Sequence, residues 1–233
     1  AKLVELNLPK NLSDFGAKWR QRDWLAKEIS SDYLTVQTHS DLKVFELLLD
    51  YIPENSHLHM ANSSVVRYCQ LFDPVSSIQY WSNRGTSGID GSTSTACGAA
   101  LADKTKIHTL ITGDISFFYD SNALWNNQLP PNLRIFMINN GGGGIFKIIP
   151  GPDSTRQQEK FFEAKHNFNA EFICKAFGVS YMKATSLADS EEQIREFYAP
   201  SDSPKLMEIF TDSTVNHRVL NDFFASLAKV KVS

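Results

Sequence analysis

Several features of secreted, membrane-spanning and nucleic-acid-binding proteins are scarce or missing in this sequence. Its three cysteines (Cys69, Cys97 and Cys174) are odd in number, widely spaced and set in apolar sequence, so we expect buried reduced thiols rather than disulfides or a metal site. No apolar run approaches the roughly 18 residues of a membrane span, and the first ten residues lack the pattern of a secretory signal. The net charge of −3 gives no reason to expect a polyanionic partner. We therefore expect a soluble, cytoplasmic protein that binds no nucleic acid.

Common phosphate-binding and metal-binding motifs are also missing. There is no GxxxxGK[ST], because Lys147 follows Phe146 rather than a glycine, and the glycine run at 141–144 lacks the last glycine of GxGxxG. The six histidines show no metal-ligand spacing, and we interpret His57 and His59 as polar residues of a strand or loop. Neither a P-loop nor a dinucleotide-binding motif is indicated.

The sequence does contain a regular alternation of strand and helix patterns. Strands are expected at 57–61, 78–82, 107–112, 133–138, 180–183 and 205–210, and helices at 17–29, 42–52 (capped by Ser40), 63–71, 91–101, 116–128, 169–177, 188–198 and 215–227. This order predicts an α/β fold with a doubly wound, about six-stranded parallel sheet and helices on both faces. Residues 1–35 are interpreted as a linker from a preceding domain and 36–233 as the ligand-binding domain.

Two polar clusters follow consecutive apolar strands of this predicted sheet. Gly113-Asp114 comes directly after the strand at 107–112, and two asparagines with four glycines follow the strand at 133–138. Because the carboxyl ends of neighbouring parallel strands lie side by side, and α/β sheets bind ligands there, the two clusters are expected to form one site.

The residue types in these clusters indicate a hard cation. A carboxylate oxygen of Asp114, the amide oxygen of Asn140 and a carbonyl of the glycine run, assigned to Gly142, would give Mg²⁺ (or Mn²⁺) three oxygen ligands. Water and phosphate oxygens would complete the octahedron. The predicted ligand is therefore Mg²⁺ carrying a diphosphate.

A Gly-Asp followed some two dozen residues later by Asn-Asn resembles the cofactor motif of the thiamine diphosphate enzymes. In those enzymes the motif begins Gly-Asp-Gly, whereas here Ile115 and Ser116 follow Asp114. The resemblance implies that thiamine diphosphate is the cofactor and that Gly113, Asp114, Ile115, Ser116 and Asn140 contact it.

Further segments narrow the resemblance. NSSVVR at 62–67 and SNRGTSGIDG at 82–91, with GDISFFYDSNAL at 113–124 and NNGGGGIF at 139–146, resemble the carboxyl-terminal domain of the 2-succinyl-5-enolpyruvyl-6-hydroxy-3-cyclohexene-1-carboxylate synthases of menaquinone biosynthesis. The match covers about 57–150, and SNRGxSGIDG is lacking in decarboxylases and acetohydroxyacid synthases. That family decarboxylates 2-oxoglutarate and adds the succinyl carbanion equivalent to isochorismate.

The same resemblance implies roles for further residues. Arg67 and Arg84 would hold substrate carboxylates, with Ser63 beside them, because the guanidinium group binds carboxylates with two parallel hydrogen bonds. A structural alternative stays open, in which Arg67 pairs on its own helix and Arg84 fixes a loop. By the same resemblance, Ile89 would support the cofactor in its bent conformation. An apolar wall beside the reacting carbon would be formed by Ile145, Phe146 and Ile149. Ordinary core packing is the alternative for these four residues.

The family's site also needs parts that this chain does not contain. In these enzymes a glutamate on a pyrimidine-binding domain activates the cofactor, which lies between that domain of one subunit and the diphosphate domain of its neighbour. We therefore expect a homodimer or homotetramer, and a chain that is the carboxyl-terminal part of a longer enzyme and inactive alone. Two alternatives stay open: another thiamine diphosphate-dependent 2-oxoacid decarboxylase or synthase, and a non-catalytic module that binds a phosphorylated ligand.

Overall fold

The computed structural model describes residues 13–149, 151, 155 and 157–229. Among these, residues 37–220 form one compact unit, and 13–36 with 221–229 form a second. The larger unit holds the sheet and all of the residues that the sequence singles out for a site.

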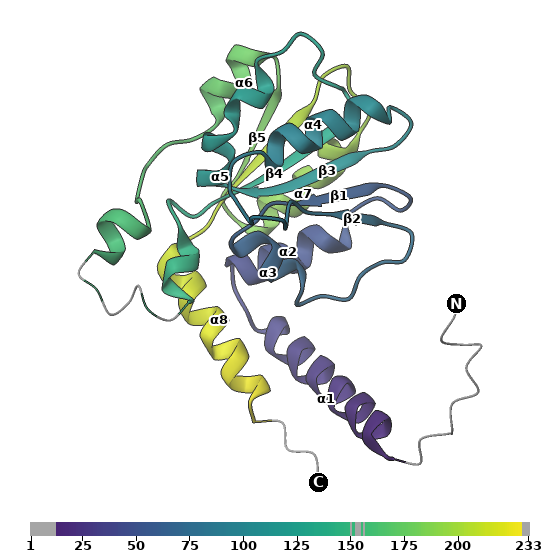
Figure 1. The fold of residues 1–233 in the computed structure, drawn as a ribbon, viewed down its shortest axis with the longest axis vertical. Helices are drawn as coiled ribbons and strands as arrows, with labels where there is room; N and C mark the ends of the chain where they lie inside the picture. The colour runs from purple at the N-terminus through teal and green to yellow at the C-terminus, as the bar shows by residue number, and fades with distance from the viewer. Residues whose placement is uncertain (1–12, 150, 152–154, 156, 230–233) are drawn as a thin grey trace. The chain divides into compact units, whose positions relative to one another are not determined.

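The described part of the larger unit contains a six-stranded sheet in which every pairing is parallel. Its order is β2-β1-β3-β4-β6-β5, with the strands visible in Figure 1. Their bounds are β1 His57–Met60, β2 Gln79–Trp81, β3 His108–Gly113, β4 Leu133–Asn139, β5 Ser180–Ala184 and β6 Lys205–Phe210. The chain leaves β1 toward β2 and later returns to place β3 on the other side, so the sheet has a topological switch point at β1 and β3.

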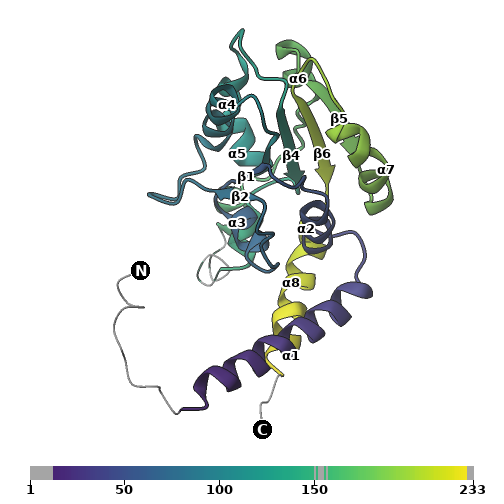
Figure 2. The same cartoon turned by 90° about the vertical axis from the view of Figure 1, so that its right-hand side faces the viewer.

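Helices cover both faces of this sheet, which confirms the predicted doubly wound fold. The helices of the larger unit are α2 Asp41–Asp50, α3 Ser64–Cys69, α4 Ser92–Ala102, α5 Asp114–Tyr119, α6 Glu171–Phe177 and α7 Leu187–Tyr198. α1 Phe15–Thr35 belongs to the smaller unit, and α8 Ser213–Leu227 includes residues of both units. Figure 2 shows α4 and α5 on one side of β4 and β6 and α7 on the other.

The two faces of β4 pack against different helices because side chains alternate along a strand. Ile135 and Met137 belong to a core cluster with Cys97 of α4, Phe117 of α5 and Cys174 of α6. On the opposite face, the ring of Phe136 lies 4.2 Å from that of Phe197 in α7, measured between centroids. Every residue of β4 is therefore buried, as expected of a central parallel strand.

One predicted helix, at 116–128, is wrong. The structure has α5 at Asp114–Tyr119 and then a 3₁₀ turn at Ser121–Leu124. Between them the carboxylate of Asp120 accepts hydrogen bonds from the backbone N–H and the hydroxyl of Ser94, at 2.7 and 2.5 Å. This tertiary contact with α4 competes with continued helix, and the local sequence carries no signal of it.

The cap predicted at Ser40 is only partly right. Ser40 does precede α2 in an extended conformation, and its carbonyl accepts the first helical hydrogen bond, from Val44 N at 2.9 Å. Its hydroxyl, however, donates to the carbonyl of Thr38 at 3.3 Å and makes no capping bond.

The expectation for the cysteines is confirmed. Cys69, Cys97 and Cys174 are free and buried, and burial raises the pKa of each thiol to about 12. In the part of the chain that the structure describes, no helix is long and apolar enough to cross a membrane.

Candidate functional site

A cavity of about 260 Å³ opens at the carboxyl ends of β1, β3 and β4, beside the switch point of the sheet, where open α/β sheets bind ligands. The sequence-predicted residues that line it are Ser63, Ile89, Gly113, Asp114, Ile115, Ser116, Asn140, Gly142, Ile145 and Phe146. Arg67, Arg84 and Ile149 are not among the lining residues. The structure thus joins the two polar clusters, as predicted from the strand ends.

Asp114 is a buried carboxylate that accepts hydrogen bonds from the segments following both β3 and β4. It follows β3 directly and begins α5, where its Oδ1 accepts from the backbone N–H of Ile115 at 2.7 Å. Its Oδ2 accepts from the backbone N–H of Gly142, in the glycine run after β4, at 2.9 Å. A side chain held by two backbone donors presents its remaining lone pairs to the cavity in a fixed direction.

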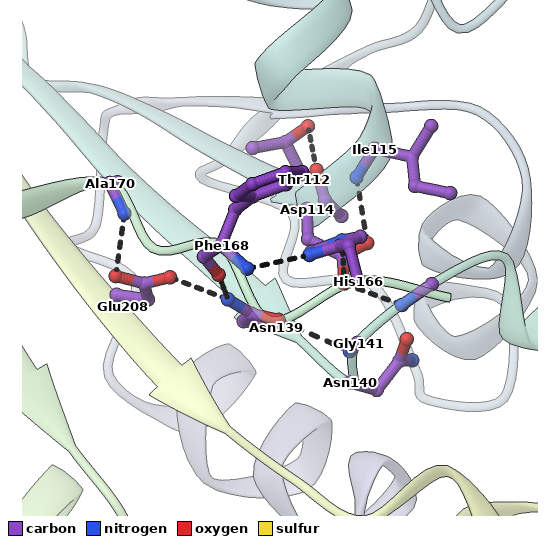
Figure 3. A network of polar contacts seen from close by, with 12 residues as sticks. Thr112, Asp114, Ile115, Asn139, Asn140, Gly141, His166, Phe168, Ala170 and Glu208 are labelled. Atoms are coloured by element: carbon purple, nitrogen blue, oxygen red, sulfur yellow. Dashed lines mark hydrogen bonds and ion pairs between the residues drawn. The ribbon is translucent and has the colours of Figure 1, made fainter. Parts of the chain in front are cut away.

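His166 contacts the same carboxylate and was not predicted. Its Nε2 lies 3.2 Å from Asp114 Oδ2, and this contact with the carboxylate raises the pKa of His166. The residue lies in an irregular segment 52 positions beyond Asp114, so no local pattern in the sequence could connect the two. Figure 3 shows His166 directed toward Asp114.

The two adjacent asparagines face different surroundings. Asn139 bonds only to other parts of the protein. Its Nδ2 donates to Phe168 O at 2.9 Å and to Glu208 Oε1 at 2.6 Å. Its Oδ1 accepts from Gly141 N at 3.1 Å. Asn140 lines the cavity, and its Oδ1 is buried with no hydrogen-bond partner among the described residues. Of the two, only Asn140 has a free oxygen for a ligand (Figure 3).

The glycine run packs against protein on one side. Gly142 has φ +152°, and a Cβ there would come within 2.6 Å of the carbonyl oxygen of Glu163. Gly143 N donates to that same carbonyl at 2.6 Å, and His166 N donates to Gly141 O at 3.1 Å. Glycine is therefore needed here because the segment 163–166 lies along the run.

Asp41, at the start of α2, is a second buried carboxylate in the cavity wall. Its Oδ2 accepts from Asn140 Nδ2 at 3.0 Å, and its Oδ1 accepts from Thr211 Oγ1 at 2.6 Å. Burial raises the pKa of Asp41 to about 6, although the hydrogen bonds from Thr211 and Asn140 act in the opposite direction. The sequence indicated only a helix start at this position.

The two arginines that the resemblance singled out are exposed and do not line the cavity. Arg67 donates from Nη1 to the carbonyl of Ser63 at 2.6 Å, within its own helical turn. Arg84 donates from Nη1 to Asn62 Oδ1 at 2.7 Å. Since Asn62 and Ser63 both line the cavity, each guanidinium is one residue away from it.

Apolar side chains complete the wall. Ile89, Ile145 and Phe146 line the cavity, and the ring of Phe146 lies 5.5 Å from that of Phe162, between centroids. The backbone of Ile89 is held to α5, because Ser116 Oγ donates to its carbonyl at 2.7 Å. The site therefore combines buried oxygen acceptors with an apolar wall.

The comparison with protein families decides which proteins share this arrangement. The family described as thiamine pyrophosphate enzyme, C-terminal TPP binding domain, matches residues 61–209, a span that begins directly after β1 and contains the ends of β3 and β4. The chain belongs to the thiamine pyrophosphate enzymes. The thiamine diphosphate-binding fold that the resemblance implied is thereby confirmed.

Individual relatives carry one further name, 2-succinyl-5-enolpyruvyl-6-hydroxy-3-cyclohexene-1-carboxylate synthase. The protein of that name from Christiangramia forsetii is 49% identical over 83% of this chain and 33% of its own length. Those from Flavobacterium johnsoniae and Porphyromonas gingivalis are 45% and 40% identical over 87% and 94% of this chain, and 36% and 38% of theirs. The chain therefore spans about a third of the length of these relatives.

The side chains at the site of this thiamine pyrophosphate enzyme fit a magnesium diphosphate. Mg²⁺ prefers carboxylate and carbonyl oxygens, and the cavity offers the Asp114 carboxylate together with the unpartnered Asn140 Oδ1. A buried amide oxygen without a partner is costly, and a bound cation would supply one. The donor set is all oxygen, as a hard cation requires.

A different cluster, at the amino ends of β1 and β3, brings His57, Asp103 and His108 together, with ligand atoms within 4.8 Å of one another. It does not suit a metal. Trp81 Nε1 can only donate, so His57 Nδ1, at 3.0 Å, is an acceptor and the neutral ring carries its proton on Nε2. His108 likewise uses Nε2 to donate to Asp103 O at 3.2 Å and Nδ1 to accept from His59 Nε2 at 3.1 Å.

The three histidines thus form a stack of neutral rings within the fold. The rings of His57 and His108 are 4.5 Å apart and nearly parallel, and burial lowers the pKa of both His59 and His108. His57 and His59 lie on a strand, as the sequence indicated, but their pairing with His108 depends on the β1–β3 register, which places His57 opposite His108.

Proposed function

We propose that this chain is the Mg²⁺-diphosphate-binding portion of a 2-succinyl-5-enolpyruvyl-6-hydroxy-3-cyclohexene-1-carboxylate synthase. The observation that carries the proposal is the buried, unpartnered Oδ1 of Asn140 in the same cavity wall as the Asp114 carboxylate. The relatives' shared name and their 40–49% identity support the choice of this enzyme among those that use the cofactor.

In this proposal Asp114, Asn140 and the carbonyl of Gly142 hold Mg²⁺ (or Mn²⁺), and Gly113, Ile115 and Ser116 contact the diphosphate. The thiazolium of thiamine diphosphate supplies the carbanion chemistry. The protein's part is to fix charge and position before the substrate arrives, so that little reorganisation is needed during the reaction. Ile89, Ile145 and Phe146 keep the reacting region apolar, which strengthens electrostatic interactions there.

The substrates in the proposal are 2-oxoglutarate and isochorismate, both carboxylates. Arg67 and Arg84, with Ser63 beside them, bind these carboxylates. Their present acceptors, Ser63 O and Asn62 Oδ1, lie in the cavity wall, so a short rotation of either side chain would redirect its guanidinium to a ligand. A guanidinium on a carboxylate forms a charge-assisted pair stronger than its bond to a neutral carbonyl.

The complete protein in this proposal has more than this chain. A pyrimidine-binding domain of a neighbouring subunit contributes the activating glutamate, the assembly is a homodimer or homotetramer in the cytoplasm, residues 1–35 are a linker and 36–233 the diphosphate domain. The coverage of only about a third of each relative supports a further domain.

The test is product formation by the complete protein supplied with thiamine diphosphate and Mg²⁺. With 2-oxoglutarate and isochorismate we expect the synthase product by mass spectrometry, and no product when either substrate is replaced by pyruvate or chorismate. Turnover of another 2-oxoacid alone would favour a different thiamine diphosphate enzyme. Cofactor binding without turnover of any 2-oxoacid would favour a non-catalytic binding module.

A further inference from the structure

The side-chain amide of Asn140 has two chemically opposite ends. Its Oδ1 can accept a hydrogen bond or bind a cation, whereas its Nδ2 can only donate. At the site described above, only the orientation with Oδ1 free would suit Mg²⁺. A neighbouring group must therefore fix the orientation of the Asn140 amide relative to the ligand.

Asp41 is the neighbour that can fix this orientation. Asn140 Nδ2 donates to Asp41 Oδ2 at 3.0 Å, and an ionised carboxylate is acceptor-only. A rotated amide would set its oxygen against the carboxylate and lose this bond. The orientation of Asn140 therefore follows from chemistry and does not depend on how nitrogen and oxygen are assigned.

Asp41 itself forms hydrogen bonds with two other segments of the chain. Thr211, directly after β6, donates from Oγ1 to Asp41 Oδ1 at 2.6 Å. Asn216 of α8 accepts from Asp41 N at 2.8 Å through Oδ1 and donates to Thr211 Oγ1 at 3.0 Å through Nδ2. Because Thr211 already accepts from Asn216, its own proton points to Asp41, and both carboxylate oxygens of Asp41 are acceptors.

We propose that Asp41 is a positioning residue for the cation: it fixes the amide of Asn140 so that Oδ1, and not Nδ2, is presented to the metal-diphosphate. This inference rests on the proposed function of the cavity. Asp41 need not touch the cation, because its effect passes through Asn140. The arrangement couples the end of β6 and the start of α2 to the ligand.

An isosteric substitution separates this role from simple packing. In Asp41→Asn, the new side chain keeps its oxygen toward the Thr211 hydroxyl, which still has a proton to donate, and turns its amino group toward Asn140. Asn140 then rotates to accept with Oδ1, which leaves Nδ2 facing the cation. The double variant Asp41→Asn with Asn140→Asp restores an acceptor at 140 and a free oxygen for the metal, at unchanged net charge.

The experiment measures Mn²⁺ affinity by electron paramagnetic resonance in the complete protein, in the presence of thiamine diphosphate. Melting temperature without cofactor is measured on the same samples. For Asp41→Asn we expect Mn²⁺ affinity to fall by about tenfold or more, which corresponds to at least about 1.4 kcal/mol, with little change in melting temperature. The double variant should regain most of the lost affinity. A matched control is Asp120→Asn, because Asp120 is also a buried carboxylate but does not line the cavity, and wild-type Mn²⁺ affinity is expected.

Each outcome decides the inference. Wild-type affinity in Asp41→Asn, or a double variant as weak as the single one, overturns the positioning role while leaving the proposed function in place. A wild-type protein that binds no Mn²⁺ with thiamine diphosphate overturns both. If Asp41→Asn fails to fold, the double variant alone decides: recovered Mn²⁺ binding supports the inference, and its absence overturns it.

Discussion

Two neighbouring residues of one type, Asn139 and Asn140, have separate tasks in this site. Asn139 uses both amide hydrogens and its side-chain oxygen to bond Phe168, Glu208 and Gly141, so it shapes the turn after β4. Asn140 contributes the oxygen that remains free. A substitution at 139 should therefore damage the fold of the turn, and one at 140 should damage ligand binding.

Also at the residue scale, the two exposed arginines give a kinetic prediction. If Arg67 and Arg84 bind substrate carboxylates, replacing either by Ala in the complete enzyme should lower kcat/KM for 2-oxoglutarate or isochorismate by about tenfold to a hundredfold. Such charge-assisted bonds contribute roughly 1.5–3 kcal/mol. Lys should rescue only in part, since it restores the charge but not the planar fork. Steady-state kinetics, with cofactor affinity measured alongside, checks this.

A purely structural role for these arginines predicts different effects of the Ala substitutions. If Arg67 only holds Ser63 O and Arg84 only holds Asn62, the Ala variants should lose melting temperature and cofactor affinity together with activity. Arg195→Ala, an exposed arginine of α7 outside the cavity lining, is the control. Unchanged kinetics for both substrates would exclude that arginine as a substrate ligand.

The glycine run gives a stability prediction. Gly142→Ala should destabilise the protein by about 1–3 kcal/mol, because φ is +152° and the new Cβ would lie 2.6 Å from Glu163 O. For a chain of this size that is a fall in melting temperature of roughly 2–12 °C. Gly98→Ala is the matched control, since it lies within α4 and a Cβ added there would meet no atom within 4 Å, and it should be neutral or stabilising. Equal melting temperatures for the two variants would contradict the close packing of the run.

At the scale of elements, the histidine stack links β1 to β3 and makes the fold sensitive to acid. Burial, followed by the neighbouring His108 and His57, lowers the pKa of His59 to about 4, below its ordinary value of 6.5. The unfolded chain therefore takes up the proton first as pH falls, and this group's contribution to stability is lost progressively from about pH 6.5 down to pH 4. Asp103 is the acidic residue facing the stack.

His59→Gln should reduce this acid sensitivity, because glutamine keeps a donor for His108 but does not titrate. Between pH 6.5 and pH 5 we expect the wild type to lose about 1.5 kcal/mol more of its free energy of unfolding than the variant does. Urea unfolding at the two pH values measures the difference. Parallel losses in both proteins would show that His59 does not titrate as described.

The elements also show why some features could be predicted from sequence and others could not. The apolar runs that became β3 and β4 are local signals, and the rule that ligands bind at strand ends sufficed to bring Asp114 and Asn140 into one cavity. Asp41 contacts Asn140, which is 99 positions away in sequence, and His166 contacts Asp114, which is 52 positions away. No local sequence pattern could have predicted either contact. The helix predicted at 116–128 was wrong for the same reason, because the carboxylate of Asp120 accepts a hydrogen bond from Ser94, which is distant in sequence.

At the scale of the whole molecule, the chain contains a cofactor-binding domain of the thiamine pyrophosphate enzymes but spans about a third of its relatives' length. We expect the chain expressed alone to fold and yet not to decarboxylate 2-oxoglutarate, because the proposed activating glutamate belongs to another domain. Carbon dioxide release measured against a no-enzyme control tests this. Sustained release by the pure chain would contradict the requirement for a second domain.

The central claim is that the strand-end cavity holds thiamine diphosphate through Mg²⁺ bound by Asp114 and Asn140. Its most direct test is calorimetric titration of thiamine diphosphate into the complete protein, with and without Mg²⁺, for the wild type and Asp114→Ala. We predict that the wild type binds the cofactor tightly only with Mg²⁺ and that Asp114→Ala does not respond to the metal, because an octahedral ion tolerates little loss of its ligands. Wild-type, Mg²⁺-dependent affinity in Asp114→Ala would contradict the claim.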